Sequence, residues 1–270
     1  MTTTKLKIIA LVTMFIDHFG YFIPGTPEWM GWIGRIAAPV FIYCVVIGFK
    51  NTSSKTKYLV RLGVAAVGMS FLNLLINYRI LYLVEHRDLY TGFRPYIEFN
   101  FFSTLFCIAI LIYLLENRKT IWLVGLFIWQ FLSALFVIVL EENSLLNNPW
   151  QIFYTQTSGN FILVEGGILF ITLGILFYFA NENKWKVLFG YSFYCLAMFY
   201  SVRRWGWSLA GINQELFGFA NYQWMMIFAL PFLLLYNGKK GIGLKYLFYI
   251  FYPLHIVLLW YISTYVYYLD

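Results

Sequence analysis

The sequence predicts an all-α fold, a polytopic bundle of about nine transmembrane helices that form a single domain over residues 1–270. Hydrophobic residues make up 61% of the chain and charged residues only 11%, whereas a soluble domain of this length needs far more polar surface. The apolar residues occur in long runs, and about 20 such residues cross the hydrocarbon layer of a membrane. The aromatic content of 22% is typical of a membrane protein with Trp and Tyr at both interfaces.

The apolar runs locate the predicted helices along the chain. The first run begins after Lys5 and resembles a signal peptide, but Asp17 and His18 interrupt it and no small-residue cleavage site follows, so we expect a retained helix. Loops rich in Pro, Gly, Asn and Ser, such as Asn147-Asn148-Pro149, separate the later runs, and residues 201–220 are compatible with a loop that carries an interfacial helix. The nine predicted spans are residues 5–23, 32–49, 58–78, 98–115, 120–140, 161–180, 186–202, 221–236 and 245–267.

The basic residues predict the orientation of the bundle. With the amino terminus in the cytoplasm and nine alternating spans, 13 basic residues fall on the inner side and 6 on the outer side, and every lysine is inside. This distribution follows the positive-inside rule, supports an odd number of spans and puts Asp270 outside. The sequence therefore predicts a multi-pass protein of the cell membrane, surrounded by the lipid bilayer.

The net charge of +7 does not indicate a nucleic-acid-binding protein. The charges lie in short loops between apolar runs rather than in one patch. The three cysteines, Cys44, Cys107 and Cys195, fall inside apolar runs without CxxC or metal-ligand spacing, so we expect small core residues and no metal site.

The most informative ionisable residues lie on the first predicted helix. His18 follows Lys7 by 11 residues, which is about three turns plus 20°, so both side chains share one face about 16 Å apart along the axis. A cation at the inner face and an imidazole deep in the bilayer suit a long anionic donor with a thioester end, such as coenzyme A, and a neutral imidazole is a suitable base. The alternative is a packed histidine and a lysine that anchors the helix at the inner face.

Two further groups extend this candidate site. Asp17 lies about 100° round the helix from His18, and we expect it to pair with Arg35 near the outer end of a short helical hairpin, in either a structural or a functional role. His255, just after Pro253, is either a second active-site group or a residue that bonds a neighbouring helix's backbone freed by the proline.

Uncharged and acidic residues also gather toward the predicted outer half of the bundle, which favours either a cavity open to the outside or polar contacts between helices. They are Asn73, Asn77, Glu98, Glu165, Asn221 and Gln223.

Motifs at both ends of the chain resemble the TraX family. They are the segments 6–20, 33–41 and 57–62 near the amino terminus, and 229–241 and 245–255 near the carboxyl terminus. The resemblance implies a protein associated with acetylation of a pilin amino terminus, and a distant similarity to membrane acyltransferase family three and to heparan-glucosaminide acetyltransferases. In the acyltransferases a basic residue, ten other residues and a histidine lie on the first helix, and Lys7 and His18 match this spacing. Lysine in place of the usual arginine keeps the charge but loses bidentate phosphate binding.

Residues and resemblance together lead us to expect an acetyl-CoA-dependent acyltransferase. His18 would be the general base, with Asp17 and Arg35 beside it, where Arg35 steadies either Asp17 or an oxyanion. The acceptor, a peptide amino terminus or a glycan, would approach from the outer side. Alternatives are a transporter or flippase, although no inverted repeat is visible, and a non-catalytic assembly subunit. The residues expected to hold the coenzyme A phosphates and nucleotide at the inner face are Lys7, Arg61, Asn237, Lys239 and Lys240.

Overall fold

The computed structural model describes residues 1–86, 96–98, 100–118, 120–142, 148–205 and 220–267. All regular structure within these ranges is helical, which confirms the all-α prediction. The chain divides into two compact units. The terminal unit comprises Met1–Ile47 and Leu176–Asp270, and the central unit comprises Gly48–Ile175. A single domain over residues 1–270 stays a prediction.

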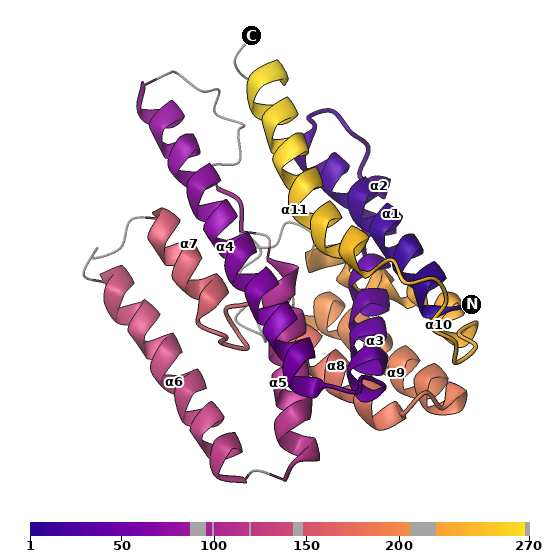
Figure 1. The fold of residues 1–270 in the computed structure, drawn as a ribbon. Coiled ribbons are helices and arrows are strands. Elements are labelled where there is room, and N and C mark those ends of the chain that lie inside the picture. Colours follow the sequence, from indigo (N-terminus) through magenta and orange to yellow (C-terminus); the bar gives the residue numbers. More distant parts are fainter. Residues whose placement is uncertain (87–95, 99, 119, 143–147, 206–219, 268–270) are drawn as a thin grey trace. The chain divides into compact units, whose positions relative to one another are not determined.

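The terminal unit brings the two ends of the chain together. It contains α1 (Thr3–Phe22), α2 (Trp29–Gly34), most of α3 (Ala37–Lys50), the end of α8 (Gly167–Ala180) and α9 (Lys184–Trp205). The 3₁₀-helix η2 (Ala220–Ala229), α10 (Leu230–Leu234), α11 (Lys245–Ile262) and the π-helical turn η3 (Ser263–Tyr267) complete it. α1 packs against α2 and α11, and α9 packs against η2 and α10 (Figure 1).

Local chemistry sets the limits of α1. The side-chain oxygen of Thr2 accepts a hydrogen bond from the amide of Lys5, which makes Thr2 the N-cap. The helix ends at Phe22, and Pro24 follows the C-cap Ile23 because a proline cannot continue it. At this end the hydroxyl of Ser263 donates to the carbonyl of Phe22 over 2.8 Å, which ties the end of α1 to the end of α11.

The central unit contains the end of α3 and four further helices before α8. These are α4 (Lys55–His86), α5 (Phe101–Glu116), α6 (Thr120–Glu142) and α7 (Asn148–Thr157). α4 packs against α5 and α7. Buried amides and hydroxyls join these helices: Asn73 Nδ2 donates to Gln156 Oε1 over 3.1 Å, and Ser103 Oγ donates to the Gln156 carbonyl over 2.6 Å. Within the central unit, these contacts favour the reading of its polar residues as groups that hold helices together.

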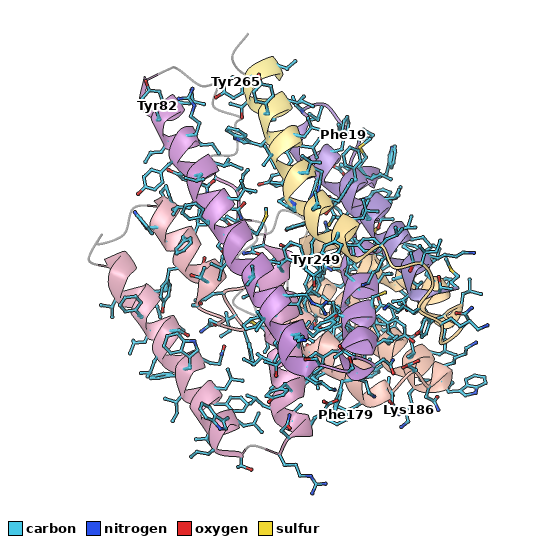
Figure 2. The ribbon with its side chains drawn as sticks, viewed as in Figure 1. Phe19, Tyr82, Phe179, Lys186, Tyr249 and Tyr265 are labelled. Carbon is cyan, nitrogen blue, oxygen red and sulfur yellow. The ribbon has the colours of Figure 1, made fainter. Side chains whose placement is uncertain are left out.

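Long apolar helices indicate a membrane protein. Within the residues that the structure describes, four helical segments are long and apolar enough to cross a bilayer: Trp29–Lys50, Lys55–Leu83, Thr120–Val139 and Tyr246–Val266. Large apolar side chains on these helices are exposed: Phe131 on α6 is 69% exposed and Tyr82 on α4 is 50% exposed. Tyr82 lies near the end of α4 (Figure 2). Exposed side chains of this kind suit hydrocarbon rather than water. In the terminal unit, Lys186 lies at the opposite end from Tyr265 (Figure 2).

Several predicted spans differ from the helices in detail. The predicted span 32–49 lies within the segment Trp29–Lys50, in which a turn at Arg35 and Ile36 separates α2 from α3. The predicted span 58–78 is part of the longer α4. α7 was not predicted, because Asn147-Asn148-Pro149 was interpreted as a loop. Pro149 instead occupies the first turn of a helix, where its missing N–H costs nothing. The predicted interfacial helix between Ser201 and Ala220 falls mainly on residues outside the described ranges, and Asp270 also lies outside them.

Candidate active site

Two buried histidines from opposite ends of the chain lie in contact within the terminal unit. His18 on α1 is 4% exposed and His255 on α11 is 2% exposed. The Nδ1 atom of His18 lies 2.6 Å from Nε2 of His255, and the two rings are nearly parallel, with centroids 4.9 Å apart. The sequence singled out both residues but contained no signal that they meet.

The hydrogen bonds of His255 determine which nitrogens carry protons when both rings are neutral. His255 Nδ1 lies 2.7 Å from the carbonyl oxygen of Phe251, and a carbonyl only accepts, so Nδ1 must donate. In a neutral ring, Nε2 of His255 is then the acceptor, and His18 Nδ1–H must donate to it. In a neutral His18 ring, the lone pair that can accept a proton is therefore on Nε2, and Nε2 is the basic atom.

Aromatic rings surround the histidine pair. The ring of Phe251 stacks on His255 with centroids 4.9 Å apart, and Phe15 lies 6.2 Å from His255. Tyr252 lies 6.2 Å from the ring of His18. His255 bonds the carbonyl of Phe251 in its own helix, four residues earlier, whereas one of its two predicted roles was a bond to the backbone of a neighbouring helix. Apolar surroundings strengthen the hydrogen bonds within the pair.

Asp17 and Arg35 form the ion pair that the helical hairpin predicted. Arg35 Nη2 lies 2.7 and 2.6 Å from the two carboxylate oxygens of Asp17. Arg35 Nη1 donates to Gln223 Oε1 over 3.0 Å, and Nε donates to the carbonyl of Gly31 over 3.1 Å. With all three of its nitrogens engaged, Arg35 holds Asp17 and joins α1, α2 and η2. Of the two predicted roles, this geometry favours steadying Asp17 over oxyanion binding.

A short segment before α11 covers the beginning of α1 (Figure 1). We call residues 237–242 the strap. The amides of Thr3 and Thr4 donate to the carbonyls of Lys239 and Lys240 over 2.9 and 3.1 Å, and Thr4 Oγ1 donates to the Ile242 carbonyl over 2.6 Å. Two of the unpaired amides at the start of a helix are therefore satisfied by backbone carbonyls, so an anion at this end would bind mainly through side chains.

The predicted phosphate-binding residues fall into two groups. Lys239 and Lys240 are exposed on the strap, and Lys7 lies one to two turns into α1 with its ammonium 5.4 Å from the ring of Phe248. These residues belong to the terminal unit. Arg61 belongs to the central unit, where its guanidinium lies 5.6 Å from the ring of Tyr58.

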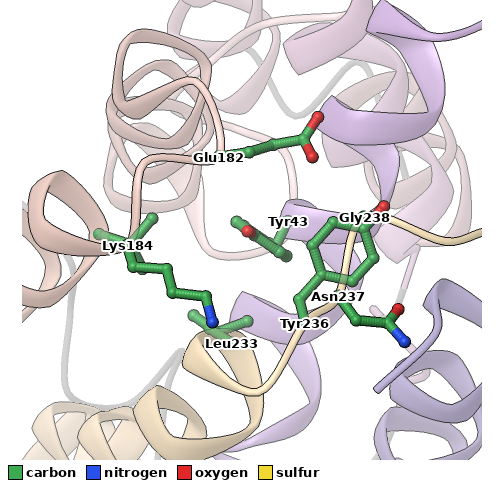
Figure 3. Close-up of a pocket in the computed structure, with 8 residues that line it drawn as sticks. Tyr43, Glu182, Lys184, Leu233, Tyr236, Asn237 and Gly238 are labelled. Atoms are coloured by element: carbon green, nitrogen blue, oxygen red, sulfur yellow. The ribbon is translucent and has the colours of Figure 1, made fainter.

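A pocket of about 320 Å³ opens beside the strap, within the terminal unit (Figure 3). Asn237 was predicted as part of a nucleotide site and is in its wall. The sequence did not single out Tyr43, Glu182 or Lys184, because Tyr43 lies in an apolar run and the other two lie in a short turn between helices. The pocket is lined by Tyr43, Glu182, Lys184, Val187, Leu233, Tyr236, Asn237 and Gly238. Among the described residues, no group of His, Cys, Asp or Glu side chains is arranged to hold a metal ion.

Comparison with known proteins identifies one family. A family model described as TraX protein matches residues 2–263, a range that includes both buried histidines, the Asp17–Arg35 pair and the strap. No curated protein and no solved structure matches the chain.

The close approach of Gly34 to Asp17 leads to a test of the ion pair. A Cβ atom at position 34 would lie 2.2 Å from the Asp17 carboxyl carbon, so Gly34→Ala must displace the carboxylate from Arg35. We expect the free energy of unfolding to fall by about 1–3 kcal/mol, which would be measured as a lower Tm of the purified protein. The control is Gly125→Ala on α6, where no atom lies within 4 Å and alanine favours the helix. An equal Tm for the two variants would show that the Asp17–Arg35 geometry contributes nothing to stability.

Proposed function

The chain belongs to the TraX family, and from that premise we propose that it is a membrane-embedded acyltransferase. It moves an acetyl group from cytosolic acetyl-CoA to an amine or hydroxyl at or beyond the outer face, on a peptide amino terminus or a glycan. The observation that carries the proposal is the 2.6 Å contact between His18 and His255. Two coupled imidazoles inside an aromatic enclosure are more than helix packing requires, and they provide a base at a defined atom.

The proposed reaction uses Nε2 of His18 as the general base. This atom removes the proton from the acceptor N–H or O–H while the acceptor nitrogen or oxygen attacks the thioester carbonyl carbon. When the carbon–sulfur bond breaks, the same proton passes to the thiolate sulfur, so the products are the acetylated acceptor and a free thiol. Between these steps His18 is an imidazolium, and its Nδ1–H donates to Nε2 of His255.

His255 acts as a positioning residue in this scheme. Its Nδ1–H is held by the carbonyl of Phe251, which leaves Nε2 as an acceptor that orients His18 and stabilises its charged form. The ion pair between Arg35 and Asp17 holds α1 in place at the residue next to His18. The alternative within the same proposal is an acyl-imidazole on His18, which rapid acid quenching and mass spectrometry would detect.

The donor binds with its phosphates at the strap in this proposal. The hydrogen bonds of Thr4 to the strap put Lys240 at the start of α1, and His18 lies 14 residues further on, roughly 21 Å along the helix axis. A donor that spans this distance keeps its charged end outside the hydrocarbon layer and its thioester near the histidine pair. Arg61 stays a predicted contact of the phosphates.

The proposed topology has nine spans in the cell membrane, with the amino terminus in the cytoplasm and the carboxyl terminus outside. Its support is the distribution of lysines in the sequence, together with the four long apolar helices and the shorter apolar helices Phe101–Glu116, Gly167–Ala180 and Tyr222–Leu234. A transporter or an assembly subunit would share this topology but would not consume acetyl-CoA. Turnover of acetyl-CoA by the purified protein in lipid nanodiscs therefore separates the proposed enzyme from both alternatives.

Replacement of the histidines tests the mechanism. We expect His18→Ala to lower transfer by about 10²–10⁴-fold per mole of folded protein, with coenzyme A binding close to wild type. Tm should fall modestly, because the buried Nε2 of His255 loses its donor. His255→Leu should cost less, and His255→Gln should recover part of the rate because its amide oxygen can accept from His18 Nδ1–H. Near-wild-type turnover in His18→Ala would reject the mechanism. A lower Tm and yield with unchanged specific activity would make His18 a structural residue.

Replacement of the strap lysines tests the donor site. The Lys239→Ala, Lys240→Ala double variant keeps the backbone carbonyls that bond α1 but removes two cations. We expect acetyl-CoA affinity to fall by several-fold to about tenfold, and more at low ionic strength, where charges are less screened. Lys186→Ala, an exposed lysine at the start of α9, is the control. Unchanged affinity of the double variant in calorimetry would move the phosphate site elsewhere.

Cysteine labelling tests the topology. The native cysteines Cys44, Cys107 and Cys195 are all buried, so Asp270→Cys provides a selective target for a membrane-impermeant reagent. We expect labelling from the outer side of intact cells. Labelling only after the inner face is opened would indicate an even number of spans.

A further inference from the structure

The pocket beside the strap is walled by two aromatic rings that meet at nearly a right angle. The rings of Tyr43 and Tyr236 meet at 88° with centroids 5.8 Å apart, and Phe177 holds Tyr43 from another side, 5.2 Å away. Two perpendicular rings form a corner in which a planar ligand stacks on one ring and presents its edge to the other. Val187 and Leu233 add apolar wall, and the volume of about 320 Å³ is at the lower end for small-molecule sites, enough for a nucleoside rather than a whole coenzyme.

The turn that carries Glu182 is held in an unfavourable backbone conformation. Asn181 and Glu182 have φ angles of 49° and 59°, in the left-handed region that residues with a Cβ rarely adopt, and Glu182 lacks the short polar side chain that makes this region tolerable for asparagine. The next residue, Asn183, caps α9 by accepting hydrogen bonds from the amides of Trp185 and Lys186 over 3.0 and 3.1 Å. The turn therefore holds the Glu182 carboxylate at the pocket, where strain of this kind points to a functional role.

The charges around the pocket favour a neutral ligand group inside it over an anionic one. Glu182 lines the pocket, so a phosphate inside it would meet a carboxylate. Lys184 lies on the opposite side of Tyr43 from Tyr236 in Figure 3, whereas Lys239 and Lys240 follow Asn237 on the exposed strap. A nucleotide would accordingly place its base in the pocket and its phosphates on the lysines outside.

We propose that this pocket binds the adenine ring of the acyl donor and selects it by a hydrogen bond from the exocyclic amino group to Glu182. The inference rests on the proposed function, which supplies a coenzyme A thioester as donor. A carboxylate accepts from the amino group of adenine but repels the carbonyl oxygen that hypoxanthine carries at the same position. The amide of Asn237 and the hydroxyl of Tyr43 would be donors to the remaining ring nitrogens, and Lys184 would be near the ribose or its phosphate.

The location of the pocket agrees with the proposed donor path. Asn237 and Gly238 belong to its wall, and the amide of Asn237 donates to the carbonyl of Met1 over 2.9 Å, so the pocket lies beside the start of α1. His18 lies on the same helix, 16 residues beyond Thr2, roughly 24 Å along the axis. A base in the pocket and a thioester at His18 would lie at the two ends of one extended donor.

Binding of paired coenzymes to the full chain in nanodiscs tests the proposal. The probes are coenzyme A and its analogue with hypoxanthine in place of adenine. We expect wild type to prefer coenzyme A by about tenfold, the usual effect of losing one hydrogen bond and facing a repelled oxygen. In Glu182→Gln the amide can donate to the hypoxanthine carbonyl, so the preference should fall to within about twofold. Glu28→Gln, an exposed acid in the same unit, should keep the wild-type preference.

The Glu182→Gly variant separates the effect of the carboxylate on ligand binding from its effect on protein stability. Glu182→Gly removes the carboxylate and relieves the left-handed strain, so we expect an equal or higher Tm together with loss of the base preference. If coenzyme A binds but wild type and Glu182→Gln treat the two probes alike, the adenine site is wrong and the acyltransferase proposal stands. If neither coenzyme A nor acetyl-CoA binds or turns over with wild type, the proposed function fails and the adenine site fails with it.

Discussion

Burial of two imidazoles in an aromatic environment is the constraint on which the terminal unit depends. A polar group taken out of water without a hydrogen bond costs several kcal/mol, roughly 2–7 depending on the reference, so His18 and His255 must satisfy each other. The carbonyl of Phe251 then determines the direction of every hydrogen bond in the series. A shift of α1 by one residue would turn His18 about 100° away from His255. The histidine pair therefore sets the register of α1 on α11, and the strap and the Ser263–Phe22 bond hold the same register at the two ends.

The part of the site that the sequence predicted correctly is the part encoded by local spacing. Hydropathy identified the all-α class and most helices, and the hairpin geometry led to the Asp17–Arg35 pair because the two residues are only 18 positions apart. The contact between His18 and His255 joins residues 237 positions apart, for which one sequence contains no local signal. The strap was equally hidden, because its bonds use backbone carbonyls of Lys239 and Lys240 rather than side chains.

The residues that could not be predicted from the sequence are of types that fit more than one structural role. Pro149 ends helices in their interior but starts them in the first turn, and the neighbouring asparagines made the loop interpretation equally reasonable. The sequence Asn-Glu-Asn is typical of a solvated loop, and it does not indicate that the backbone at Glu182 is left-handed. Tyr43 was indistinguishable from core because its ring is buried, and its role in a pocket wall depends on Tyr236, which is distant in sequence.

The strap has a consequence for how the protein is made. α1 leaves the ribosome long before the strap, so its first amides find their carbonyl partners only after residues 239 and 240 have been synthesised, and His18 gains its partner later still. Contacts of such sequence separation are slow to close, because the entropy of a long loop is lost before the contact forms. A chain that ends before α11 therefore contains α1 while its first amides and His18 still lack these partners. The histidine pair can form only after His255 has been added, so an incomplete chain has no partly formed version of it.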